Sequence, residues 1–69
     1  MHYFLLERVD GVDGPPPGVD ATRRFGLLSQ AEARARFLAR QGRTIVWMGA
    51  IRGVGVEEPE QLKVYPAGA

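Results

Sequence analysis

Apolar blocks separated by polar and glycine-rich segments predict several strands along this chain. Residues 2–9 (HYFLLERV) are aromatic and aliphatic without a breaking residue, which predicts a first strand whose first half is the more buried. Residues 45–48 are continuously apolar, as in a central strand buried on both faces. We expect a turn at residues 52–53 with a return segment at 54–57, and a short last strand at 61–65 (QLKVY).

The clearest predicted element is a helix over Ser29 to Gly42. Ser29 and Glu32 have the S-x-x-E spacing of a capping box, in which two side chains bond backbone N–H groups at a helix start. The body is rich in helix-forming residues, and Gly42 suits the left-handed conformation that often follows a helix end. The residues of its apolar stripe are Ala31, Ala35 and Leu38, with Phe37 at the border. The alanines predict close packing of this helix on a sheet.

Residues 22–28 (TRRFGLL) leave two arrangements open. They form either an extended lead into the helix, which gives β-α-β-β, or a second strand paired with residues 2–9, which gives ββαββ. We favour ββαββ. In both cases the fold class is α+β, with one helix packed on a small, mainly antiparallel sheet of three or four strands.

Residues 9–20 (VDGVDGPPPGVD) connect the first strand to the rest of the chain. Consecutive prolines favour a stiff polyproline II segment, and Asp-Gly pairs favour turns. We interpret this segment as an exposed loop, because a linker needs two domains and 69 residues make one. A partner-contacting arm is the alternative. Residues 66–69 are expected to be a frayed tail of the same single domain, residues 1–69.

The chain contains no cysteine, which excludes disulfides, thiolate metal sites and cysteine nucleophiles. No apolar run is long enough for a signal peptide or a membrane span, so we expect a soluble cytoplasmic protein without a membrane partner. Domains of this size are often stabilised by association, which makes a partner protein or a homo-oligomer a reasonable expectation.

Few residues are suited to catalysis. His2 is the only histidine, and Ser29, the only serine, is already explained by the predicted capping box. Asp10, Asp13 and Asp20 do not have the spacing of a calcium-binding loop, and no phosphate-binding glycine motif occurs. We therefore predict a protein that is not an enzyme and has no cofactor or metal.

Charge is segregated along the chain. Residues 1–22 carry four acidic residues against one arginine, a net charge of −3, and residues 23–53 carry seven arginines against one glutamate, a net charge of +6. Residues 54–69 carry three glutamates against one lysine, a net charge of −2. Arginine suits phosphates and carboxylates, and it is enriched in the hot spots of protein interfaces. Arg34 is unusual because it lies on the packing side of the predicted helix, so we expect it to extend its head outward or to pair with an acid across the sheet.

Two function classes fit this charge pattern. A nucleic-acid-binding protein would use the arginine-rich segment 23–52, but the isoelectric point of about 8.3 is modest and no RNA-binding motif occurs. We predict instead a small non-enzymatic protein-binding module. The candidate partner-binding residues are Arg24, Arg36, Arg40, Glu57, Glu58 and Glu60.

In size, composition and charge segregation the chain resembles small accessory proteins of phages and mobile elements, which include inhibitors such as anti-CRISPR proteins. This resemblance of type implies an inhibitor or modulator of a larger nucleic-acid-handling complex.

Overall fold

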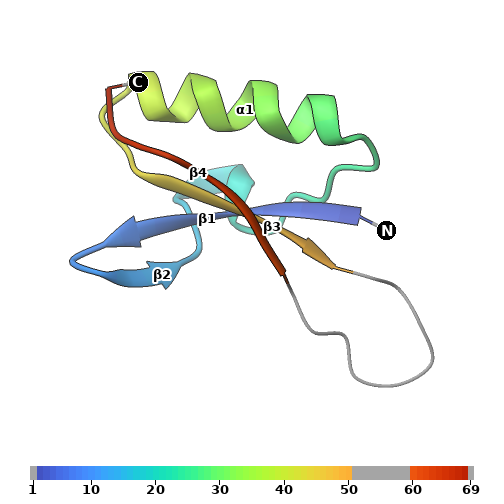
Figure 1. Ribbon diagram of the computed structural model, residues 1–69, viewed down its shortest axis with the longest axis horizontal. Helices are drawn as coiled ribbons and strands as arrows, with labels where there is room; N and C mark the ends of the chain where they lie inside the picture. Colours follow the sequence, from blue (N-terminus) through green and yellow to red (C-terminus); the bar gives the residue numbers. More distant parts are fainter. Residues whose placement is uncertain (1, 51–59, 69) are drawn as a thin grey trace.

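A computed structural model of the chain describes residues 2–50 and 60–68, with only the backbone described at Ala50 and Glu60. In this part of the chain, one helix packs on one face of a four-stranded antiparallel sheet with the strand order β2-β1-β3-β4 (Figure 1). The elements are β1 (His2–Val9), β2 (Val12–Gly14), the 3₁₀-helix η1 (Gly18–Ala21), α1 (Leu28–Arg40), β3 (Ile45–Ala50) and β4 (Glu60–Tyr65). This arrangement confirms the predicted α+β fold class with the order ββαββ.

The centre of the sheet is the antiparallel pair of β1 and β3. Leu5 faces Trp47 and Glu7 faces Ile45 across this pair, and these side chains point toward α1. The prediction of a central strand at residues 45–48 is confirmed, since Ile45 and Val46 are fully buried on opposite faces of β3.

The outer strand β4 confirms the strand predicted at residues 61–65. Trp47 pairs with Lys63 but the next residue, Met48, pairs with Gln61, so Leu62 is the extra residue of a β-bulge. A Cβ atom on Gly49 would lie 3.0 Å from Leu62 Cδ1, so the bulged leucine packs tightly against this position of β3. The turn and return segment expected at 52–57 lie outside the described residues.

The second strand is β2, so the prediction of a second strand at 22–28 is wrong. Asp10 and Gly11 both adopt positive φ angles, 53° and 77°, as in the tight turn that Asp-Gly favours in hairpins. This turn folds residues 12–14 back on β1 within a few residues of chain, and a short loop closes at low entropic cost. The exposed loop predicted at 9–20 therefore contains a strand and a turn of 3₁₀-helix, and within it Pro16 and Asp20 are buried.

Residues 22–28 form the extended lead into the helix. Phe25 makes a single bridge with Tyr3, in which each backbone N–H donates to the other residue's carbonyl at 2.8 Å. The side chain of Phe25 is buried in the core beside Leu5. Because β2 pairs with the second half of β1, this lead can meet only the first half.

The N-cap lies two residues earlier than predicted, at Leu27 and not at Ser29, and the predicted capping box is wrong. Leu27 occupies the N-cap position without a side-chain hydrogen bond, Ser29 lies inside the first turn, and Glu32 bonds Arg36 instead. The end of the helix agrees with the prediction, since Gly42 adopts a φ of 88°. The buried side chains of α1 are Ala31, Ala35, Leu38 and Ala39, which confirms the predicted stripe.

The C-terminal tail returns to the end of α1, as Figure 1 shows. The Gly68 N–H donates to the Ala39 carbonyl at 2.7 Å, which satisfies a carbonyl of the last helical turn. Within the tail predicted to fray, residue 68 is thus hydrogen-bonded to the end of the helix. No helix in the described part of the chain is long and apolar enough to cross a membrane.

Candidate binding surface

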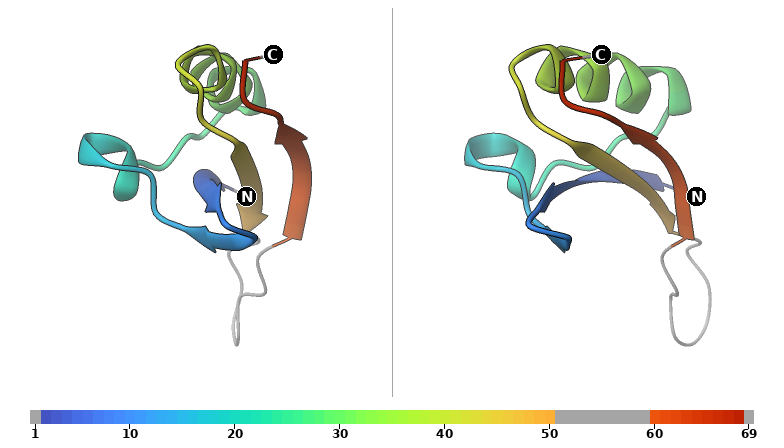
Figure 2. Two further views of the ribbon diagram at one scale, coloured as in Figure 1. Left: turned by 90° about the vertical axis from the view of Figure 1, so that its left-hand side faces the viewer. Right: turned by 60° about the vertical axis from the view of Figure 1, so that its left-hand side comes forward.

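Helix α1 has two flanks with different neighbours. Figure 2 shows η1 (cyan) on one side of the helix axis and β4 (orange-red) on the other. We call Arg34 and Phe37, together with Asp20 of η1, the η1 flank. We call Glu32 and Arg36, together with Lys63 and Tyr65 of β4, the β4 flank.

The η1 flank is fixed by an ion pair between Arg34 and Asp20. Arg34 Nε donates to Asp20 Oδ1 at 3.0 Å and Nη2 donates to Oδ2 at 2.8 Å, so the guanidinium and the carboxylate meet in a bidentate pair. The Asp20 side chain is 4 % exposed and that of Arg34 is 30 % exposed. The hydrogen bonds from Arg34 hold the pKa of Asp20 below its ordinary value, although burial acts in the opposite direction. The acid expected to pair with Arg34 is thus in the proline-rich segment and not across the sheet.

Phe37 is the exposed aromatic residue of α1. Its side chain is 48 % exposed, and the Arg34 guanidinium carbon lies 4.7 Å from the centroid of its ring. Arg40, three residues further on, is a neighbour of Phe37 on the outer surface of the helix, and the side chains of Arg36 and Arg40 are both exposed. An aromatic ring supported by a fixed arginine is therefore presented to solvent among further arginines.

The β4 flank carries a weaker ion pair. Arg36 Nη2 donates to Glu32 Oε2 at 3.2 Å, and the Arg36 side chain is 55 % exposed. The pKa of Arg36 is raised, chiefly by a hydrogen bond with the Tyr65 side chain and to a smaller extent by Glu32. Lys63 Nζ lies 4.9 Å from the centroid of the Tyr65 ring. Two cations therefore lie around one buried tyrosine.

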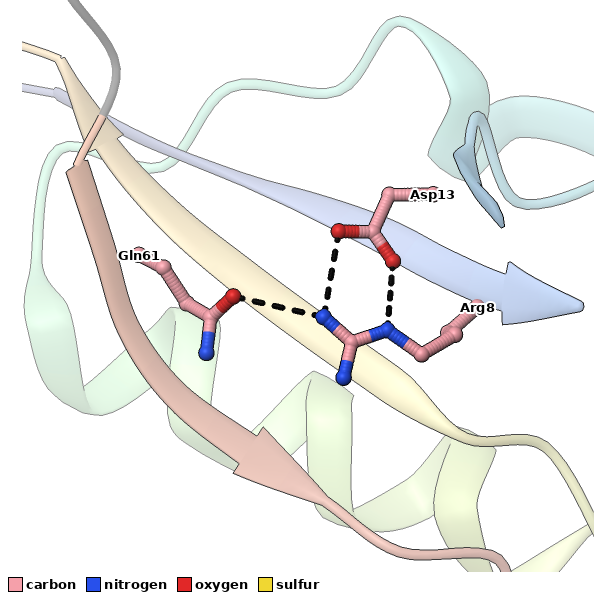
Figure 3. A network of polar contacts seen from close by, with 3 residues as sticks. All are labelled: Arg8, Asp13 and Gln61. Atoms are coloured by element: carbon pink, nitrogen blue, oxygen red, sulfur yellow. Dashed lines mark hydrogen bonds and ion pairs between the residues drawn. The ribbon is translucent and has the colours of Figure 1, made fainter. Parts of the chain in front are cut away.

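The sheet face opposite α1 is crossed by a polar network. Arg8 of β1 forms a bidentate pair with Asp13 of β2, at 2.7 and 3.2 Å, and its Nη2 also donates to Gln61 of β4 at 3.3 Å (Figure 3). Since β3 lies between β1 and β4, the Arg8 side chain passes over β3 to reach Gln61. Val46 of β3 lies on this face and is fully buried there. The network joins β1, β2 and β4 across the sheet, and it occupies the Arg8 guanidinium with contacts inside the molecule.

Folding brings the segregated charges of the sequence together. Arg43 Nη1 donates to Glu7 Oε2 at 2.7 Å, so Glu7, Asp13 and Asp20 of the acidic first segment each pair with an arginine. Two of these three arginines, Arg34 and Arg43, belong to the basic middle segment. The charge of that segment is therefore partly neutralised within the molecule.

The structure does not bring all the predicted binding residues together. Arg36 and Arg40 share the outer surface of α1, as predicted from their spacing. Arg24 lies over the ring of Phe4, at 4.9 Å from its centroid, on the sheet face opposite α1. Among the acidic candidates, Glu60 begins β4, and Glu57 and Glu58 lie outside the described residues.

The sequence interpretation missed the partners of these arginines. The position of Arg34 on the packing side of the helix predicted an acidic partner nearby, but it did not identify Asp20 as that partner. Lys63 and Tyr65 gave no comparable signal, because their place beside Arg36 depends on the register of β4. Within residues 2–50 and 60–68, no group of three side chains is placed to hold a metal ion.

Comparisons with known proteins give no relative for this chain: no protein-family model, no curated protein and no solved structure matches it.

Proposed function

We propose that this protein is a small non-enzymatic protein-binding module whose binding surface is the outer surface of α1. Phe37 is its apolar anchor, and Arg36 and Arg40 are the polar residues beside it. The observation that supports this proposal is that Phe37 is exposed while its ring packs on Arg34, which Asp20 holds in place. Aromatic residues and arginines dominate the energetics of protein interfaces.

The contact of Arg34 with the Phe37 ring matters because binding normally restricts flexible side chains, and this loss of conformational entropy weakens affinity. Arg34 is held by two hydrogen bonds to Asp20 and lies against the phenylalanine ring, so the ring has fewer conformations to lose. A scattered exposed apolar residue is ordinary in any protein. A supported aromatic ring on a helix surface that also carries exposed arginines has the composition of an interface hot spot.

The pairing of the arginines favours a protein partner over a nucleic acid. Binding to a phosphate backbone depends on cations that release counterions on contact. Arg8, Arg34 and Arg43 are each already bonded to an acid at 3.0 Å or less. Fewer arginines of residues 23–53 are therefore available to bind phosphates than the net charge of +6 suggests.

The proposed mode of action is occupation of a partner's surface, as an inhibitor or modulator of a larger complex. A module of this size can cover a surface of the standard interface area without carrying chemistry of its own. This part of the proposal rests on size and on the sequence-based expectation that the chain is not an enzyme.

The test is affinity capture from a lysate of the cells that make the protein. Phe37→Ser should abolish capture of the partner, because it removes the apolar anchor while far-UV circular dichroism stays unchanged. Val12→Ser, at a valine on β2 that is even more exposed than Phe37 (69 % against 48 %), is the control and should capture as the wild type does. Equal capture by Phe37→Ser and the wild type would contradict the proposal.

A second measurement separates the nucleic-acid alternative. Mixed-sequence DNA and RNA oligonucleotides should give no retardation in electrophoresis at about 50 mM salt, where phosphate contacts are strongest. Retardation that disappears at about 200 mM salt would favour a nucleic-acid-binding protein instead.

A further inference from the structure

The side of α1 that faces away from the sheet carries a strip of exposed side chains. Figures 1 and 2 show no described element over this side of the helix. From Ser29 onward, the exposed residues of α1 are Ser29, Gln30, Ala33, Arg36, Phe37 and Arg40, which we call the outer strip. An α-helix turns by about 100° per residue, so the outer strip lies opposite the buried stripe that contacts the sheet.

The edges of the described sheet are poorly suited to binding by strand addition. At one edge, β2 has only three residues, and the residues that follow it, 15–17, are prolines without a backbone N–H to donate. At the other edge, β4 carries the bulge at Leu62 and the exposed Lys63, and both features oppose edge-to-edge pairing in natural sheets. Recognition of a partner therefore depends on side chains, and the outer strip offers them.

The charge of the outer strip is entirely positive. Its charged residues are Arg36 and Arg40, and its other members are neutral. Within residues 2–50 and 60–68, Arg40 is in no ion pair, and Arg36 has one hydrogen bond of 3.2 Å to Glu32, outside the strip. An exposed pair of this kind contributes little free energy, so a carboxylate of a partner can take the place of Glu32.

Phe37 has one arginine three residues before it and another three residues after it, and residues three apart are neighbours on a helix surface. Arg34, on one side, is neutralised by the buried carboxylate of Asp20. Arg40, on the other side, has no such acid in the described part of the chain. A partner that encloses the Phe37 ring, which is 48 % exposed, therefore meets an unbalanced positive charge on the Arg40 side.

We propose that the outer strip binds an acidic helix of the partner protein, whose apolar side chains enclose the Phe37 ring and whose carboxylates bind Arg36 and Arg40. This inference rests on the proposed function and adds the chemistry of the partner. Arg36 and Arg40 are one helical turn apart, about 6 Å along the axis, and a helix alongside α1 presents its own residues at the same interval. A second copy of this chain does not fit, because its outer strip has the same charge.

The test is selection from a random peptide library displayed on phage, with the purified protein as the target. We expect the enriched peptides to have a net negative charge, with acidic residues three or four positions apart and apolar residues between them. Enrichment of neutral or basic peptides would overturn the proposal. Enrichment no greater than that with Phe37→Ser as the target would also overturn it.

Charge reversal locates the binding of an enriched peptide, measured by fluorescence polarisation. Arg36→Glu and Arg40→Glu should each weaken binding by about tenfold, because each places a like charge against a carboxylate. Arg24→Glu makes the same change in net charge on the sheet face opposite α1 and should leave the affinity unchanged. Equal weakening by Arg24→Glu would show that binding follows net charge only, against the proposal.

A second selection uses the double variant with Arg36→Glu and Arg40→Glu as the target. It should enrich basic peptides with apolar residues, a reversal of preference that loss of structure does not produce. Renewed enrichment of acidic peptides would contradict the assignment of the two arginines.

Further outcomes separate this inference from the proposed function. Neutral peptides whose binding is lost with Phe37→Ser would support the binding module and overturn the acidic helix. Acidic peptides that bind Phe37→Ser as tightly as the wild type would contradict both. Self-association in sedimentation equilibrium that is lost with Phe37→Ser would assign the outer strip to a second copy of the chain instead.

Discussion

The two ion pairs on the flanks of α1 start from arginines only two residues apart, yet they have different roles. Arg34 meets Asp20 through two hydrogen bonds, and the carboxylate is almost completely buried. Arg36 meets Glu32 through one bond of 3.2 Å, at the surface. The difference teaches that the position of the acid, and not the presence of the arginine, decides how firmly an arginine is tied to the rest of the fold.

Chain connectivity adds to the difference. Asp20 and Arg34 are 14 residues apart, so their pair ties the segment between β2 and α1 to the helix. Glu32 and Arg36 lie one helical turn apart, and their pair joins α1 only to itself. Removing the Asp20–Arg34 pair detaches the segment around η1 from the helix, whereas removing the Glu32–Arg36 pair releases one side chain only.

The largest expected effect is that of Asp20→Ala. It leaves the Arg34 guanidinium without its acceptor beside the core, and we expect the free energy of unfolding to fall by about 2 kcal/mol. The partial exposure of Arg34 keeps the effect below that of a fully buried pair. Urea denaturation followed by circular dichroism measures it. An effect no larger than that of Glu32→Ala would remove the distinction between the flanks.

The same pair predicts a dependence of stability on pH. The pKa of Asp20 lies below its ordinary value of 3.8 in the folded protein, chiefly because Arg34 donates to the carboxylate. The stabilisation is therefore present above the unfolded-state pKa and is lost as pH falls through the lower folded-state pKa. Stability should drop between about pH 5 and pH 2.

Asp20→Asn is the variant that isolates this dependence, because it keeps the shape of the side chain and removes the titrating group. Its acid unfolding curve should be flatter than that of the wild type. Part of the slope should remain, since the Arg8 hydrogen bonds also lower the pKa of Asp13. Curves of equal slope for the two proteins would assign the acid sensitivity to other carboxylates.

Local patterns in the sequence were sufficient for the helix and the central sheet. Ala31 and Ala35 recur at helical spacing, and the apolar run at 45–48 occurs in a strand buried on both faces. The capping box failed because its spacing fixes a helix start only when Ser29 is at the N-cap, and Leu27 occupies that position. The hairpin signal of Asp10-Gly11 was present, but the following prolines favoured a loop interpretation.

The candidate binding surface could be predicted only in part, for a physical reason. Arg36 and Arg40 share a helix face by spacing alone, so their neighbourhood follows from sequence. The burial of Asp20 depends on the path of the proline-rich segment. The contact of Lys63 with Tyr65 beside Arg36 depends on the bulge at Leu62, which sets the register of β4. Contacts between distant segments require the tertiary structure.

The smallest expected effect is that of Glu32→Ala on stability, and its small size is informative. The pair with Arg36 is exposed and lies within one helix, so its loss should change the free energy of unfolding by less than about 0.5 kcal/mol. Urea denaturation beside Asp20→Ala gives the comparison under one set of conditions. A loss above about 1 kcal/mol would mean that Arg36 needs Glu32 to cover Tyr65 and is committed to the fold, as Arg34 is. In that case the β4 flank would have no arginine to offer a partner, and the contrast between the two flanks would disappear.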